Sequence, residues 1–355
     1  MAEKVLMKGN EAIAEAAIIA GCRHYFGYPI TPQTEIAAYM AKRLPKIGGT
    51  FLQAESEIAA INMVYGAAAT GKRTMTSSSS PGISLKSEGI SYLAGCDLPA
   101  LIVNVQRGGP GLGGIQPSQS DYFQATRGGG HGDYHIIVLA PASVQEMASF
   151  TIMAFDLADE YRIPVMLLAD GTMGQMMEPV VLEAGEPKNF DKSWALTGTK
   201  MQRKHNIVNS LALIPDELEK QNFARFDKYA RITANEQRCE EYMTEDADII
   251  VAAFGIASRV SKNAINAARA EGIKVGLIRP MTLWPFPADA FKRAADKAKA
   301  FVSVELSMGQ MIEDIKLATE CRKPVLLCNR AGGMIPSSEQ VYQYILKAAE
   351  IGGAK

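Results

Sequence analysis

The chain has 355 residues, of which 47% are hydrophobic and 21% are charged, and its formal net charge is −1. This length exceeds what one hydrophobic core normally organises, so we expect about two domains. The near-neutral charge gives no electrostatic footprint for binding nucleic acid or an anionic membrane. No apolar run reaches the ~20 residues of a membrane span, and the N-terminus lacks the apolar core of a signal peptide. We therefore expect a cytoplasmic protein that binds neither nucleic acid nor membrane.

The five cysteines are scattered along the chain, and none belongs to a Cys-x-x-Cys pair. This distribution argues against a disulfide framework, a zinc site, or an iron–sulfur cluster held by this chain alone. The four histidines also lack metal-ligand spacing. We expect no metal bound by residues of this chain.

Helical and strand patterns alternate through the first half of the chain. The predicted helices span residues 11–20, 32–44, 57–70, 83–94, 120–127 and 143–161. The predicted strands span residues 24–28, 50–53, 73–78, 99–106, 135–140 and 163–169. Asn10 and Thr31 are the expected N-caps of the first two helices. Strands 99–106 and 163–169 lack polar alternation, as is typical of a parallel sheet covered on both faces. Residues 1–180 are therefore predicted to form a doubly wound α/β domain.

The sequence pattern changes at about residue 181. Residues 181–245 are more polar and irregular, which predicts a connecting arm with one long helix at 215–242. Strand patterns then return at residues 248–254, 273–279, 300–306 and 324–329, with helices such as 258–272 and 287–300 between them. Residues 246–355 are predicted to form a second, smaller α/β domain.

Four polar or glycine-rich segments follow strands of the first predicted domain. They are residues 27–33, 54–57, 76–82 and 106–114. In open α/β sheets, ligands bind at the edge where the carboxyl ends of the strands meet. These segments are therefore the candidate site.

The segment 109–114 formally matches the Gly-x-Gly-x-x-Gly pattern of dinucleotide-binding proteins. That fingerprint also requires a helix to open within the motif, so that its N-terminus meets the pyrophosphate. Here the loop continues through residues 115–117, and a helix is expected only near Ser118. A glycine-rich active-site loop is the better interpretation, and a nicotinamide-dependent dehydrogenase is the distant alternative.

Arg107 and Glu57 are the charged side chains at the most informative positions. Arg107 follows an apolar strand and precedes the glycine-rich loop, so its guanidinium is expected at the sheet edge, where it could grip a carboxylate with two hydrogen bonds. A surface salt bridge is its alternative role. Glu57 begins a helix with small residues at 60, 66 and 71, which indicates close packing against another helix or a second subunit. Glu55, by contrast, is expected near solvent.

Several longer segments occur together and in order along the chain. They are FGYPITP, AESEIAAINMVYGAAATG, TSSSSPGISL, VNVQRGGP and GIKVGLIRPMTLWPFP. The combination resembles the alpha subunit of the 2-oxoacid:ferredoxin oxidoreductases over about residues 4–350. The stretches FLQAESEIAAI and GGPGLGGIQPSQSDYFQATRGGGHGDY are most similar to the 2-oxoisovalerate, or branched-chain, enzyme. The 2-oxoglutarate enzyme is the next most similar.

The resemblance implies coenzyme A-dependent oxidative decarboxylation of a 2-oxoacid, with thiamine diphosphate as cofactor and ferredoxin as electron acceptor. This chain would supply a pyrimidine-binding domain and a domain of the transketolase C-terminal type. A beta subunit would bind the diphosphate and Mg²⁺, and gamma and ferredoxin-like delta subunits would complete the complex. Partner subunits would carry the 4Fe–4S clusters. The Gly-Asp-Gly signature with its paired Asn, which binds the diphosphate, does not occur in this sequence. Besides an oxidoreductase subunit and a nicotinamide-dependent dehydrogenase, a non-catalytic scaffold that only organises other subunits is a third hypothesis for the function.

The resemblance also implies roles for single residues. Glu57 corresponds to the catalytic carboxylate that faces the pyrimidine ring. A carboxyl group bonded to a ring nitrogen favours the imino tautomer, whose other nitrogen can take the thiazolium C2 proton. Thr31, Ser79, Ser80 and Pro81 correspond to residues that contact the cofactor.

The remaining implied roles concern the substrate. Arg107 corresponds to the clamp on the 2-oxoacid carboxylate, and Thr31 contacts substrate as well as cofactor. Gln116 and His131, on the glycine-rich loop, are further candidates for the substrate side. The sequence does not decide between a branched apolar side chain and a second carboxylate on the substrate.

Overall fold

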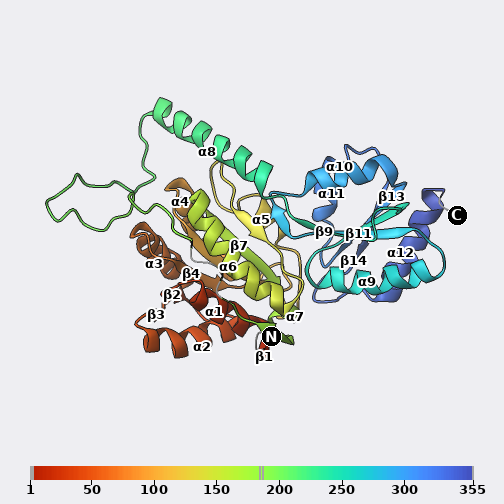
Figure 1. Ribbon diagram of the computed structural model, residues 1–355, viewed down its shortest axis with the longest axis horizontal. Helices are drawn as coiled ribbons and strands as arrows, with labels where there is room; N and C mark the ends of the chain where they lie inside the picture. The colour runs from red at the N-terminus through yellow and green to blue at the C-terminus, as the bar shows by residue number, and fades with distance from the viewer. Residues whose placement is uncertain (1–3, 184, 186–187, 354–355) are drawn as a thin grey trace.

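The computed structural model describes residues 4–183, 185 and 188–353 (Figure 1). Within these residues, a seven-stranded sheet has the order β12-β6-β7-β5-β4-β2-β3. Its strands are β2 (His24–Gly27), β3 (Thr50–Gln53), β4 (Thr74–Ser78), β5 (Ala100–Gln106), β6 (Ile137–Leu139), β7 (Pro164–Asp170) and β12 (Thr282–Trp284). All neighbours pair in parallel except β12, which is antiparallel to β6. This confirms the predicted parallel α/β fold class.

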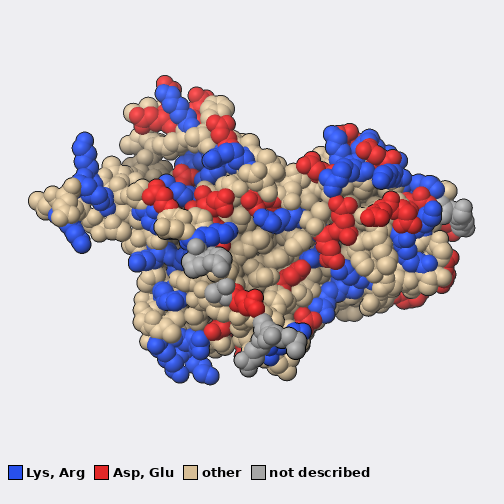
Figure 2. All heavy atoms as spheres, viewed as in Figure 1, with Lys and Arg blue, Asp and Glu red and all other residues tan. Residues whose placement is uncertain are grey.

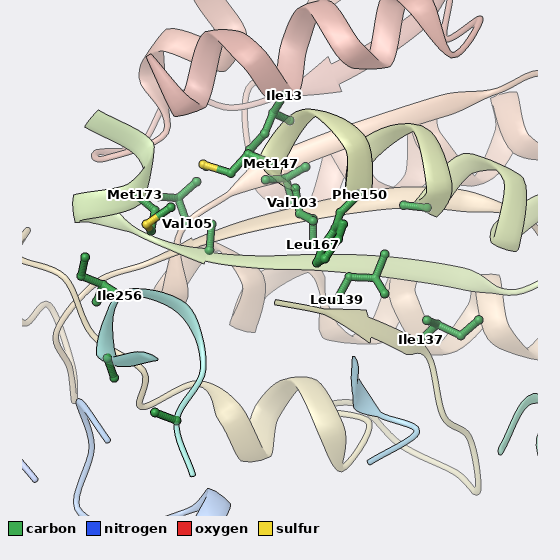
Figure 3. Packing of buried hydrophobic residues seen from close by; sticks show 14 of the residues in the cluster. Ile13, Val103, Val105, Ile137, Leu139, Met147, Phe150, Leu167, Met173 and Ile256 are labelled. Atoms are coloured by element: carbon green, nitrogen blue, oxygen red, sulfur yellow. The ribbon is translucent and has the colours of Figure 1, made fainter. Parts of the chain in front are cut away.

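Helices cover both faces of this sheet. They are α1 (Gly9–Ile19), α2 (Thr34–Arg43), α3 (Glu57–Ala69), α4 (Ser80–Gly95), α5 (Tyr122–Thr126), α6 (Val144–Tyr161) and α7 (Gly171–Gln175), with the short 3-10 helix η1 (Leu44–Ile47) after α2. Alternate residues of β5 face opposite layers: Val103 and Val105 pack with α1 and α6 (Figure 3), and Ile102 packs with α3 and α4. A strand buried on both faces needs no polar alternation, which explains the continuous apolar runs.

A second sheet lies at the other end of the molecule (Figure 1). Over the described residues its order is β14-β13-β10-β11-β9. The elements are β9 (Cys239–Tyr242), β10 (Ile249–Ala252), α9 (Gly255–Ala270), β11 (Val275–Pro280), α10 (Ala288–Lys297), β13 (Ala300–Glu305), α11 (Met311–Ala318), β14 (Val325–Asn329) and α12 (Ser338–Ile351). Strand β9 is antiparallel to β11, and the other neighbours are parallel.

The segment between the sheets extends away from the body. A small antiparallel pair, β1 (Lys4–Lys8) and β8 (Met177–Val181), precedes it, and α8 (Pro215–Asn235) returns the chain toward the second sheet (Figure 1). The extended part exposes apolar side chains, with Met201 at 98% and Ile207 at 81%. Basic and acidic side chains are interspersed over the face shown in Figure 2. Among the described residues, no helix combines the length and apolar character needed to cross a bilayer.

Several predicted helix boundaries were wrong, and three of them have a clear structural reason. Asn10 lies inside α1, where its amide donates to the Pro32 carbonyl at 2.8 Å and to Glu35 at 2.9 Å. Thr31 does not cap α2, because a turn closed by a hydrogen bond from the Gln33 N–H to the Ile30 carbonyl keeps it outside the helix. The long helix α8 ends at Asn235 instead of residue 242, because the residues that follow pair with β11 as β9.

Candidate active site

Buried polar side chains gather where β2 and β4 end. The two strands are adjacent and parallel, so their carboxyl ends lie at the same edge of the sheet. The hydroxyls of Tyr25 and Ser77 are 2.7 Å apart, and the Ser77 hydroxyl donates to Gln33 Oε1 at 2.5 Å. This network of hydrogen bonds holds the side chains of Tyr25, Ser77 and Gln33 in place at the edge of the sheet.

Glu57 is the first residue of α3 and is only 6% exposed, whereas Glu55 is exposed as predicted. The preceding Ser56 caps the helix by accepting a hydrogen bond from Ala59 N–H at 3.1 Å. A Cβ atom on Gly82 would lie 2.7 Å from Glu57 Oε1, so α3 and α4 approach closely here because residue 82 has no side chain. In the part of the chain that the structure describes, nothing donates a hydrogen bond to the Glu57 carboxylate.

Two serines at the start of α4 differ in how their hydroxyls are satisfied. Ser79 is the N-cap residue, and its buried Oγ has no hydrogen-bond partner among the described residues. Ser80 Oγ instead accepts a hydrogen bond from the Arg107 N–H at 3.0 Å and donates to Asp121 Oδ2 at 2.5 Å. Pro81 follows in the first turn of the helix. Buried polar atoms normally find partners, so Ser79 Oγ is a group that a ligand can satisfy.

Arg107 follows β5 and is 8% exposed. Its guanidinium donates to the Thr31 carbonyl at 3.0 Å and to the Leu112 carbonyl at 3.2 Å, while Nε has no partner in the described part of the chain. The structure therefore brings Thr31, Ser80 and Arg107 together, and it ties the glycine-rich loop to the sheet edge. No helix opens within that loop, because α5 begins only at Tyr122.

Of the two further substrate-side candidates, Gln116 lies on the glycine-rich loop that Arg107 contacts, whereas His131 lies away from the site. Gln116 is exposed on the glycine-rich loop, where its carbonyl accepts a hydrogen bond from the Gly108 N–H at 3.0 Å. His131 is exposed, and its carbonyl accepts a hydrogen bond from Ser91 Oγ at 2.7 Å. Ser91 lies eleven residues beyond the start of α4, about 16 Å along the helix. The structure does not bring His131 to the cluster around Glu57 and Arg107.

Sequence reasoning missed Asn104 and Asp121 at this edge. Asn104 Nδ2 donates to Asp121 Oδ2 at 2.9 Å, and Asn104 Oδ1 has no partner among the described residues. Burial raises the pKa of Asp121 above its usual value, while its bonds from Ser80 and Asn104 oppose the shift. A polar Asn within the apolar strand was a signal in the sequence for Asn104. Asp121 had no such signal, because the fold alone brings it to the strand ends.

Lys86 was also missed, although its spacing carried a signal. It follows Ile83 by three residues and precedes Ile90 by four, so it shares their buried face of α4. The ammonium group is fully buried and donates to Thr76 Oγ1 at 2.6 Å and to the Ser77 carbonyl at 3.1 Å. Burial lowers the pKa of Lys86 to about 7, and the negative charge of Glu57 opposes this shift.

The carboxyl edge of the second sheet is filled by the chain itself. The Gln119 side chain donates to the Phe254 carbonyl at 2.8 Å and accepts a hydrogen bond from Leu306 N–H at 3.0 Å. Glu305, at the end of β13, is 1% exposed and accepts hydrogen bonds from the Ser303 and Ser307 hydroxyls at 2.7 and 2.8 Å. Three backbone N–H groups, at residues 310–312, also donate to its carboxylate.

Two family models match the chain. The model described as pyruvate flavodoxin/ferredoxin oxidoreductase, thiamine diphosphate-binding, matches residues 15–259. The model described as pyruvate:ferredoxin oxidoreductase core domain II matches residues 247–341. Together with the fold, these matches show that the chain belongs to the alpha-subunit family of the 2-oxoacid:ferredoxin oxidoreductases.

Curated relatives agree with this family. The ketoisovalerate oxidoreductase subunit VorB of Methanothermobacter thermautotrophicus is 54% identical over 345 residues, which are 97% of each chain. The 2-oxoglutarate synthase subunit KorA of the same organism is 38% identical over 382 aligned positions, covering 98% of this chain and 99% of the relative. Both relatives are named as subunits of 2-oxoacid-converting enzymes.

Solved structures show the same fold. The 2-oxoglutarate:ferredoxin oxidoreductase from Magnetococcus marinus, with 2-oxoglutarate, coenzyme A and succinyl-CoA bound, superposes with a TM-score of 0.86 and 29% identity. The alignment covers 98% of this chain and 65% of the longer chain in that structure. A split-gene transketolase superposes with a TM-score of 0.60 at 13% identity, which shows a transketolase-like fold alone.

Proposed function

We propose that this chain is the alpha subunit of a branched-chain 2-oxoacid:ferredoxin oxidoreductase, a 3-methyl-2-oxobutanoate dehydrogenase. The complex would convert 2-oxoisovalerate and coenzyme A to acyl-CoA and CO₂ and pass the electrons to ferredoxin. The buried Glu57 carboxylate, without a donor among the described residues, carries the proposal of a catalytic role. The 54% identity to VorB supports the branched-chain substrate.

The residues around Glu57 fit the aminopyrimidine half of thiamine diphosphate. The ring is flat and carries polar nitrogens, and the edge offers Ser79 Oγ and Asn104 Oδ1 without partners in the described chain. When bound, thiamine diphosphate supplies the electron sink for decarboxylation. Glu57 would hold a proton at the ring nitrogen, and Thr31, Ser79, Ser80 and Pro81 would line the cofactor side of the site.

Arg107 is proposed to bind the carboxylate of the 2-oxoacid. Its Nε group has no partner within the described residues, and its position beside the Thr31 carbonyl puts it at the same edge as Glu57. An arginine that keeps free donors can bind a carboxylate with charge-assisted hydrogen bonds. Gln116, on the loop that Arg107 anchors, is proposed to face the substrate as well. His131 lies apart from this cluster and is left out of the proposal.

Partner subunits would complete the site. A beta subunit would bind the diphosphate and Mg²⁺, and it would cover Ile58 of α3 and Leu85 of α4, which are each 51% exposed. Gamma and ferredoxin-like delta subunits, with 4Fe–4S clusters in partner subunits, would carry electrons to ferredoxin. The residue ranges 1–180, 181–245 and 246–355 are proposed as the pyrimidine-binding domain, connecting arm and transketolase C-terminal-like domain of a cytoplasmic complex.

Reconstitution with the partner subunits tests this function. The complex is given a panel of 2-oxoacids with coenzyme A and a viologen dye as electron acceptor. We expect the highest kcat/KM with 2-oxoisovalerate and no turnover by the chain alone. A preference for 2-oxoglutarate would instead support the activity for which KorA is named. Turnover by the lone chain would contradict the proposed division of the cofactor site.

A further inference from the structure

A cavity of about 820 Å³ lies between α8, the connecting arm and the C-terminal ends of α4 and α6. Its walls include the turn at residues 95–97, residues 160–162 after α6, and residues 206–209 of the arm. Gly95 lies fifteen residues beyond Ser80 on α4, about 22 Å along the helix. This cavity, called the arm cavity below, therefore does not belong to the candidate active site.

Basic side chains outnumber acidic ones in the arm cavity. The basic residues that line it are Arg162, Arg225, Lys228 and Arg231, and the acidic residues are Asp97 and Glu160. Lys228 Nζ donates to Asp97 Oδ1 at 2.5 Å. Among the described residues, this is the one ion pair that involves any of the four basic side chains. The cavity therefore has an excess of positive charge.

Three of these basic groups converge on the turn at residues 95–97. Arg225 Nη2 donates to the Gly95 carbonyl at 2.6 Å, and Arg162 Nε donates to the Asp97 carbonyl at 3.2 Å. Lys228 Nζ also donates to the Arg162 carbonyl at 3.0 Å. The Nε group of Arg225 is buried and has no hydrogen-bond partner in the described part of the chain. Three basic groups therefore meet one carboxylate, and one buried donor is left over.

This crowding affects the pKa of Lys228. Burial lowers the pKa, the Asp97 carboxylate opposes the shift, and the charges of Arg162 and Arg225 lower the pKa further. An anion placed among these groups would reduce their mutual repulsion. The single carboxylate offsets one of the three basic groups. A phosphate group, which carries about −1.5 to −2 charges at pH 7, matches the other two.

We propose that the arm cavity binds a phosphorylated small molecule, whose phosphate group is held by Arg162, Arg225 and Lys228. Guanidinium groups bind phosphate oxygens with charge-assisted hydrogen bonds. The volume suits a ligand of about nucleotide size. Asn209 and Gln221 also line the cavity, and their amide groups suit the polar remainder of such a ligand. The inference does not depend on the role proposed above for Glu57.

A purely structural role for the basic groups makes a different prediction. The last carbonyl groups of α4 and α6 have no N–H partner within their helices, and positive charges stabilise such helix ends. If this were their whole role, neutral substitutions would lower stability and the wild type would not bind phosphate compounds here. Ligand binding must therefore be measured separately from stability.

Isothermal titration calorimetry of the reconstituted complex, loaded with thiamine diphosphate, makes this measurement. ADP is titrated beside adenosine, which lacks phosphate, and inorganic phosphate is added as a competitor. We expect ADP to bind with a Kd below about 1 mM, at least about 10-fold more tightly than adenosine, and phosphate to weaken its binding. Arg225→Gln and Lys228→Met should each weaken ADP binding at least about 10-fold.

The matched control is Lys220→Met, which removes the charge of an exposed lysine of α8 that does not line the cavity. It should leave ADP binding unchanged. Absence of ADP binding to the wild type, or an unchanged Kd in both Arg225→Gln and Lys228→Met, overturns the proposal.

Tryptophan fluorescence decides the question if neither variant assembles. The Arg162 guanidinium carbon lies 4.4 Å from the centroid of the Trp194 ring, so a phosphate bound to Arg162 should change the emission of Trp194. We expect ADP to change the emission of the wild-type complex and to leave that of a Trp194→Phe complex unchanged. The same response in both complexes would contradict binding at this cavity.

Discussion

Two buried glutamates, one at each sheet, show opposite ways of placing a carboxylate inside a protein. Glu305 is 1% exposed and accepts hydrogen bonds from two hydroxyls and three backbone N–H groups. Glu57 is 6% exposed and accepts none from the described residues. A buried charge is costly unless donors surround it. The comparison indicates that Glu305 stabilises the fold, whereas Glu57 is held ready for a ligand.

The largest expected effect is that of Glu57→Gln on turnover. The amide keeps the shape of the side chain but cannot exchange a proton with a ring nitrogen. We expect kcat of the reconstituted complex to fall at least about 100-fold, with assembly and thermal stability unchanged. Steady-state kinetics measure kcat, and a thermal melting curve measures the stability of the complex. Turnover near the wild-type value would remove Glu57 from the chemistry.

The matched substitution Glu305→Gln should have the opposite effect, lowering stability while leaving turnover unchanged. Its amide group places N–H donors against backbone N–H groups that now bond to a carboxylate. We expect the free energy of unfolding to fall by about 2–3 kcal/mol, and kcat per folded complex to stay near the wild-type value. Chemical denaturation of the full chain measures the first quantity. An unchanged stability would show that the bonds to Glu305 contribute little.

Alanine substitutions at two arginines should have smaller effects on activity than Glu57→Gln. Arg107→Ala should raise the KM for the 2-oxoacid by about 10-fold or more, because it removes charge-assisted donors at the site. Arg127→Ala removes an ion pair to Asp314 in which the arginine side chain is 48% exposed. We expect it to cost less than about 1 kcal/mol of stability and to leave KM unchanged. Equal KM values for the two variants would contradict the role of Arg107.

Local patterns in the sequence predicted the features that depend on residues close together in the chain. The apolar run at 99–106 became β5, and the separation of exposed Glu55 from buried Glu57 was confirmed. The features that were not predicted depend on contacts between residues far apart in the sequence. Asp121 reaches Ser80 only through the fold, and β9 exists because β11 offers it a partner. Neither partnership leaves a periodic pattern at the residue itself.

The short strand β12 has a consequence for how this protein is made. Thr282 and Trp284 pair with β6, so a segment from the second half of the chain closes the edge of the first sheet. Unpaired strand edges attract strands from other molecules. While the ribosome is still synthesising the residues before 282, the first half has no strand to cover β6. The edge of β6 therefore stays unpaired until residues 282–284 have been synthesised, and we expect a chaperone that covers this edge to reduce aggregation of the nascent chain.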